Sequence, residues 1–143
     1  MEIATIGFTR TTARHFFERL TAARVQRVID VRLHNESQLA GFAKQSDLPY
    51  FLAKLGGISY EHDLRLAPTE DLLKKYREDQ DWDHYAAAFK KLMRRRKITT
   101  VVDRNAFARK TALLCSEPTA DHCHRRLVAE LLAKQWSTSI EHL

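Results

Sequence analysis

Short apolar runs alternate with helical patterns along the chain, and this alternation restricts its fold more than any other feature. Residues 3–7, 28–32 and 112–115 are mainly apolar or β-branched, the second run having a charged end, and each run is predicted to form a strand. Strands that are apolar throughout are typical of a parallel sheet covered on both faces. We therefore predict an α/β fold: a three-layer sandwich with a mostly parallel central sheet of four to five strands and helices on both faces.

The segments between these strands complete the predicted order of elements. A helix from Thr11 to Leu20 links the first two strands as a βαβ unit, and a helix opened by Asp47 and Pro49 leads to a strand at 58–61 as a second such unit. Further predictions are a loop from Asn35 to Ser46 anchored by Phe42, helices beginning near Pro68, Asp81 and Asp121, and an edge strand at 139–142.

Composition narrows the class of protein. The 143 residues carry 24 Lys and Arg against 18 Asp and Glu, a formal charge of +6, with 44% hydrophobic residues. These values predict one domain spanning residues 1–143 and permit an anionic partner. Two cysteines are too few for a disulfide-stabilised secreted domain, and no apolar run reaches the roughly 20 residues that span a bilayer. We expect a cytoplasmic protein without a membrane segment; its oligomeric state is left open.

Polar side chains follow the predicted strands, where ligands bind in an open parallel sheet. They include acids, cations, imidazoles and thiols, which are the groups that an acid/base, anion-binding or nucleophilic site needs. These residues are Thr9, Asp30, Arg32, Tyr60, His62, Cys115, Ser116, Glu117, His122, Cys123, His124 and Arg125; the first strand itself ends in Gly7.

Two pairs among these residues have competing interpretations. Asp30 and Arg32 could form a solvated pair at the strand end, a partly buried ion pair or a substrate clamp. Cys115 ends a strand and is interpreted first as a small core residue. Cys123 is predicted to lie in the first turn of a helix beside cations, where its thiol pKa would fall, which makes it the candidate nucleophile. In the alternative, Cys123 packs inward while Asp121 caps the helix.

Motifs that are absent from the sequence argue against several common classes of enzyme. The sequence has no G-x-G-x-x-G, G-x-x-x-x-G-K-[ST], G-x-S-x-G or H-E-x-x-H motif. Residues 94–97 form the densest basic run, which is interpreted first as complementing a helix C-terminus and second as a phosphate contact. No metal site is predicted, because the spacing of the cysteines and histidines matches no recognised zinc pattern. Zinc held by Cys115, Cys123 and nearby histidines, including His62, is kept as an alternative on the chemistry of these side chains.

Several segments together resemble the domain of unknown function 488 family, small prokaryotic α/β proteins. They are Ile3–Thr9, Asp30–Asn35, Ser37–Phe42, Gly57–His62, Leu66–Thr69, Leu113–Pro118 and Cys123–Arg126. The most specific of these is the pair Leu-Leu-Cys-x-Glu, ending a strand, and Cys-His-Arg, opening a helix. The resemblance implies the α/β fold and a candidate site at this pair, and it implies no activity.

Three functions are consistent with these residues. The first is an enzyme acting on a phosphate-bearing or nucleic-acid substrate. Its predicted catalytic residues are Cys123, His124, Glu117 and Asp30, and its predicted substrate-binding residues are Thr9, Arg32, His62, Cys115 and Arg125. The second is a nucleic-acid-binding module without catalysis, and the third is a cysteine/histidine metal or redox sensor.

Overall fold

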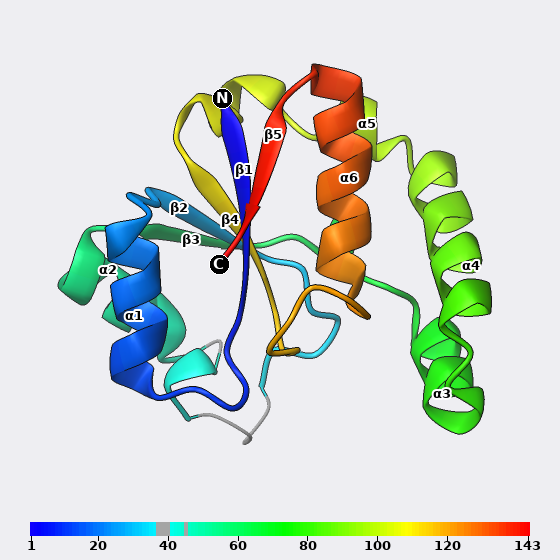
Figure 1. Cartoon of the computed structure of the whole chain (residues 1–143), viewed down its shortest axis with the longest axis horizontal. Coiled ribbons are helices and arrows are strands. Elements are labelled where there is room, and N and C mark those ends of the chain that lie inside the picture. The colour runs from blue at the N-terminus through cyan, green and yellow to red at the C-terminus, as the bar shows by residue number, and fades with distance from the viewer. Residues whose placement is uncertain (37–40, 45) are drawn as a thin grey trace.

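A parallel five-stranded sheet forms the centre of the molecule in the computed structural model, which describes residues 1–36, 41–44 and 46–143 (Figure 1). The strand order is β3-β2-β4-β1-β5. The strands are β1 (Glu2–Gly7), β2 (Arg27–Asp30), β3 (Ser59–His62), β4 (Thr111–Cys115) and β5 (Ser139–His142). Every neighbouring pair in this order is parallel, and β5 is the edge strand that the sequence predicted.

Strand β4 lies between the two strands of the first predicted βαβ unit. The sequence predicted β1 and β2 as the strands of this unit, and they are parallel strands of one sheet, but β4 separates them and pairs with both. Ala112 of β4 is opposite Ala4 on one side and Val28 on the other. The predicted second unit is confirmed, because β2 and β3 are direct neighbours.

Helices cover both faces of the sheet, which confirms the predicted fold class. Helices α1 (Ala13–Ala22) and α2 (Leu48–Gly56) lie on one face, and α3 (Glu70–Asp79), α4 (Trp82–Arg95), α5 (Ile98–Val101) and α6 (His124–Trp136) lie on the other (Figure 1). Alternate strand residues point to opposite faces. Ile3 and Leu113 pack with α4 and α6, whereas Ala4 and Leu114 pack with α1 and α2.

The helix ends follow local signals in the sequence. Asp81 accepts a hydrogen bond from the backbone N–H of His84 and caps α4, as predicted. Gly57 ends α2 in the left-handed region at φ 61°, where a residue without a Cβ is favoured. Helix α6 departs from the prediction: it begins at His124 with Cys123 at the N-cap position, and not near Asp121.

The segment after β2 contains the part of the chain that the structure leaves undescribed. The predicted strand through Arg32 ends at Asp30, and residues 37–40 and 45 of the predicted loop and of the family-like segment lie outside the described residues. Within this segment a short helical turn, η1 (Gly41–Ala43), presents Phe42 to the rings of Phe16 and Phe17, at 5.3 and 5.8 Å between centroids. Phe42 is thus an anchor, as predicted. In the described ranges, every helix is too short or too polar to cross a membrane.

Candidate functional site

A pocket of about 440 Å³ opens at the carboxyl end of the sheet. Its walls come from the segments that follow β2 and β4, from α3 and α4, and from the start of α6. The lining residues are Arg32, Leu33, His34, Pro68, Leu73, Tyr76, Arg77, Gln80, Tyr85, Cys115, Ser116, Glu117, His122, Cys123 and His124. A pocket of this size suits a small molecule.

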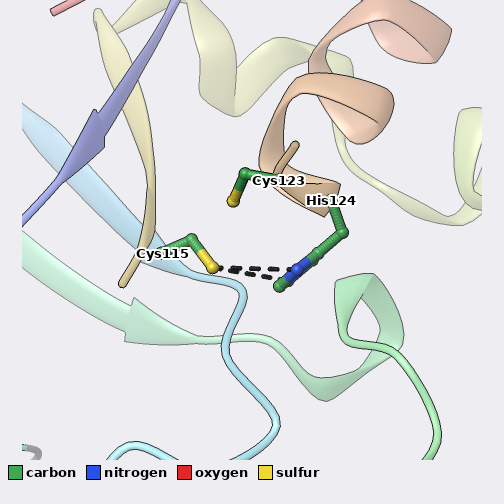
Figure 2. A group of neighbouring side chains, drawn as sticks. All are labelled: Cys115, Cys123 and His124. Carbon is green, nitrogen blue, oxygen red and sulfur yellow. Dashed lines mark hydrogen bonds between the residues drawn. The ribbon is translucent and has the colours of Figure 1, made fainter. Parts of the chain in front are cut away.

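Cys115, Cys123 and His124 point toward one another at this pocket (Figure 2). Their sulfur and nitrogen atoms all lie within 4.8 Å of one another, and all three residues are buried. Cys115 Sγ lies 3.7 Å from His124 Nδ1 and 4.0 Å from Nε2. The strand end and the helix start, which are eight residues apart in sequence at the two cysteines, therefore place two thiols and one imidazole together.

A backbone carbonyl fixes the orientation of the His124 ring. His124 Nε2 donates to the carbonyl oxygen of Val31 at 2.7 Å, and the ring of Phe89 lies 5.4 Å away between centroids. Because Nε2 carries this proton, Nδ1 is the nitrogen that can accept or release a proton toward Cys115. A nucleophile, a base and a group that orients the base are the three parts of an activated cysteine site.

The electrostatics favour Cys115 as the thiolate. A hydrogen bond from the Cys123 thiol lowers the pKa of Cys115 well below its ordinary value, and His124 and Arg125 act in the same direction against the effect of burial. Burial lowers the pKa of His124, but the negative charge on Cys115 and the Val31 carbonyl outweigh it, so the net pKa of His124 is raised. Both shifts stabilise a thiolate and imidazolium pair.

Cys123 has the opposite pKa shift, which corrects the sequence prediction. Burial and the neighbouring Cys115 raise its pKa well above the ordinary range, and Arg125 only partly offsets them. The side chain packs inward, as the alternative interpretation had it, but Asp121 does not cap α6; its carbonyl oxygen accepts a hydrogen bond from Arg126 Nη1 at 2.8 Å. The direction of the pKa shift at Cys123 is therefore the reverse of the one expected for a thiol in the first turn of a helix beside cations.

Arg125 supports this arrangement from behind the pocket. Its side chain is 1% exposed; Nη1 donates to the carbonyl oxygen of Glu117 at 2.6 Å and lies 3.7 Å from Cys123 Sγ. The loop between the cysteines is also held by Thr9, whose hydroxyl donates to the carbonyl oxygen of Ser116 at 2.6 Å. Thr9 and Arg125, both predicted to bind substrate, therefore contact the loop backbone and do not line the pocket.

Gly7 lets the same loop approach the end of β1. A Cβ at this position would lie 1.6 Å from the carbonyl oxygen of Glu117 and 2.8 Å from Arg125 Nη1.

We expect Gly7→Ala to displace the loop and to destabilise the protein by about 1–3 kcal/mol, the usual range for overpacking. Chemical denaturation measures the change. Gly41→Ala is the matched control because a Cβ there meets no heavy atom of the described residues within 4 Å. Equal stability of both variants would contradict the prediction.

Asp30 and Arg32 form a buried ion pair beside the pocket. Arg32 Nε and Nη2 donate to the two carboxylate oxygens of Asp30 at 2.9 and 2.8 Å, and Tyr60 donates its hydroxyl to Oδ2 at 2.6 Å. Asp30 and Arg32 are 0% and 3% exposed. Burial and the adjacent Asp30 raise the pKa of Tyr60, which keeps its proton on the hydroxyl. His62 joins the network from the next strand, where Nε2 donates to the Arg32 carbonyl oxygen at 2.7 Å.

The structure brings together only part of the predicted site. Of the nine residues predicted to be catalytic or substrate-binding, five line the pocket: Arg32, Cys115, Glu117, Cys123 and His124. Asp30 and His62 lie outside its lining, and both contact Arg32 in the segment after β2. The sequence missed Tyr76, Arg77 and Tyr85, because α3 and α4 were interpreted as packing helices. The sequence feature that could have pointed to this wall is the group of aromatic residues in the two helices. In the structure, Tyr76, Trp82 and Tyr85 contact one another.

The buried cluster of two cysteines and one histidine could also hold a metal ion. Cys115, Cys123 and His124 supply two sulfurs and one nitrogen, a soft donor set that suits zinc. Nδ1 would be the ligand atom of His124 because Nε2 is bonded to the Val31 carbonyl, a second contact that metal-ligating histidines usually make. A metal there would require both thiols to lose their protons.

Comparisons with known proteins identify the family. No curated protein and no solved structure matches the chain significantly. The family model described as domain of unknown function DUF488 matches residues 12–132. That range contains the β4 strand, both cysteines, His124 and all but the last turn of α6. The resemblance seen in the sequence is therefore confirmed, and the chain belongs to the DUF488 family.

Proposed function

We propose that this protein is an enzyme that uses Cys115 as a nucleophile and His124 as the acid and base, acting on a small phosphate-bearing substrate. The observation that carries the proposal is the Cys115–His124 contact of 3.7 Å at a pocket, with His124 oriented by Val31. Perturbed pKa values of paired groups in a cleft are typical of catalytic sites. In this proposal Cys123, the nucleophile expected from the sequence, instead donates a hydrogen bond to the reacting thiolate.

The charges around the pocket support an anionic substrate. Glu117 is the single carboxylate among the described lining residues, whereas Arg77 and three histidines line the same pocket. The charge of Arg32, which also lines it, is already paired with Asp30. Arg77 is exposed at the rim, where a guanidinium can pair with phosphate oxygens. His122 stacks on Trp82 at 5.1 Å and 22°, so its ring is held as part of the wall. Tyr76 and Tyr85 add surfaces on which a planar part of the substrate could pack.

The proposed reaction has two steps. Cys115 Sγ attacks phosphorus, the S–P bond forms as the bond to the leaving oxygen breaks, and the His124 imidazolium gives its proton to that oxygen. Neutral His124 then takes a proton from a water molecule whose oxygen attacks phosphorus. The new O–P bond forms as the S–P bond breaks, inorganic phosphate leaves, and the Cys115 thiolate and the His124 imidazolium are restored. Arg125 is a positioning residue here, because it holds the loop and places a positive charge behind the two sulfurs.

We expect Cys115→Ser to lose turnover of phosphate esters, whereas Cys123→Ser retains some. A panel of aryl and nucleoside monophosphates would be screened with release of phosphate as the readout. In parallel, alkylation of Cys115 by iodoacetamide is expected below the usual thiol pKa of about 8.5 and is expected to slow in the presence of inorganic phosphate. Turnover that persists in folded Cys115→Ser, or alkylation that needs the pH of a free cysteine, would contradict the proposal.

The alternative function, nucleic-acid binding by the basic run, has less support. Arg96 of this run donates through Nη1 to the carbonyl oxygens of Leu64, Arg65 and Ala67, so its guanidinium ties α4 to the turn η2 (Leu64–Leu66). We expect affinity for single-stranded RNA to change little in Arg94→Ala. A steep salt dependence that this variant reduces would instead favour the alternative.

A further inference from the structure

The two thiols lie close enough for a disulfide between them, which the proposed reaction does not involve. Cys123 Sγ lies within 4.8 Å of Cys115 Sγ and turns toward it from the start of α6 (Figure 2). The residues between them, 116–122, form a loop without helix or strand, so the sulfurs are carried by separate elements joined by irregular backbone. A disulfide needs an S–S distance of about 2.05 Å, which side-chain rotation and a small loop adjustment would supply.

We propose that Cys123 is a resolving thiol: when peroxide oxidises Cys115, Cys123 captures it as a Cys115–Cys123 disulfide that switches the site off reversibly. The inference rests on the proposed function, because it requires Cys115 to be the reactive thiolate. The chemical class of the oxidant is a small hydroperoxide, which can enter a pocket that both cysteines line. This is a regulatory event at the site and is separate from phosphate-ester turnover.

The chemistry balances in two steps. The Cys115 thiolate attacks one oxygen of hydrogen peroxide, the S–O bond forms and the O–O bond breaks, and His124 protonates the departing hydroxide to water. The sulfur is oxidised by two electrons and the peroxide is reduced. Cys123 then attacks the sulfenic sulfur; the S–S bond forms, the S–O bond breaks, and the hydroxide leaves with the thiol proton as a second water.

Charge explains why Cys123 would act only after the first step. In the reduced site the negative charge on Cys115 is one of the causes that raise the pKa of Cys123. A sulfenic acid on Cys115 is neutral, so this repulsion disappears while the positive charge of Arg125 stays near the Cys123 sulfur. Oxidation of one thiol therefore favours ionisation of the other.

Peroxide treatment followed by alkylation of the denatured protein and intact-mass measurement tests the proposal. The chain has two cysteines, so each thiol can be counted without interference. Wild-type protein is expected to lose both thiols together as a disulfide and to recover both with dithiothreitol. Cys123→Ser is expected to form a sulfenic acid that dimedone traps, and then to over-oxidise irreversibly at Cys115.

The controls separate this inference from the proposed function. Circular dichroism establishes that Cys123→Ser is folded, and Cys123→Ala serves if it is not. If the pH dependence of alkylation shows a Cys115 thiolate but wild type over-oxidises as fast as Cys123→Ser with no disulfide, the resolving role is overturned and the proposed nucleophile stands. If neither thiol reacts with peroxide and Cys115 alkylates only at high pH, both fail. Zinc retained by the purified protein and lost in either cysteine variant would also overturn the resolving role.

Discussion

Asp30→Ala is expected to lower the free energy of unfolding by about 3–5 kcal/mol, because it leaves the guanidinium of Arg32 buried without its partner. The carboxylate is 0% exposed and accepts hydrogen bonds from Arg32 and from the Tyr60 hydroxyl. The side chains of Asp30 and Arg32 are both almost fully buried, so solvent compensates little for the lost contacts. Urea denaturation followed by far-UV circular dichroism measures the change.

Two further variants test the cause of this loss. Glu18→Ala removes an ion pair with Arg14 that lies at the surface, where solvent screening leaves little stabilisation, so little change is expected. Asp30→Leu combined with Arg32→Met removes both charges and is expected to be more stable than Asp30→Ala. A loss below 1 kcal/mol in Asp30→Ala, where a median exposed pair would fall, would contradict the buried-pair interpretation.

His124→Asn is expected to reduce kcat/KM for a phosphate ester by roughly 10²–10⁴-fold, the usual contribution of a positioned acid or base. The positive charge that helps to hold Cys115 as a thiolate is lost with the imidazole. The sign of the pH effect follows: alkylation of Cys115 should move to higher pH, since the pKa of Cys115 rises toward its ordinary value. Stopped-flow alkylation across the pH range gives this shift independently of turnover.

A second histidine variant tests whether the changes in Cys115 alkylation and turnover are specific to the loss of His124. His15 is exposed on α1, away from the pocket, so His15→Asn should keep the wild-type alkylation profile and turnover. A structural role alone would make His124→Asn unstable without moving the alkylation profile of the folded fraction. An unchanged profile in folded His124→Asn would therefore remove His124 from the proposed mechanism.

Local patterns were sufficient to predict most elements and the edge of the sheet that carries the site. The apolar strand runs, the Asp81 cap and the glycine that ends α2 can each be recognised from a few consecutive residues. The position of the polar residues at one edge follows from the parallel sheet. The pKa directions of the two cysteines were not predictable in this way. They depend on Cys115, Cys123 and His124 coming together and on the Val31 carbonyl that orients His124, which requires the end of β4, the start of α6 and the segment after β2 to pack.

Strand order was the other feature that local patterns could not supply. The helix after β1 predicts a parallel strand on the same sheet, but it does not say whether a third strand separates the pair. That strand is Thr111–Cys115, whose partners are β1 and β2 at once. The α3 and α4 wall of the pocket was missed for the same reason, because Tyr76 and Tyr85 reach the site through packing between distant segments.

The late arrival of the central strand sets the order in which the protein can be assembled on the ribosome. Translation supplies roughly 5–20 residues per second, so β1 and β2 must wait several seconds for the residues that will separate them. During that interval a nascent chain ending before residue 111 exposes unpaired strand edges that invite pairing with other chains. Chaperone capture of such truncated nascent chains, released once β4 has emerged, is the expected signature in the cell.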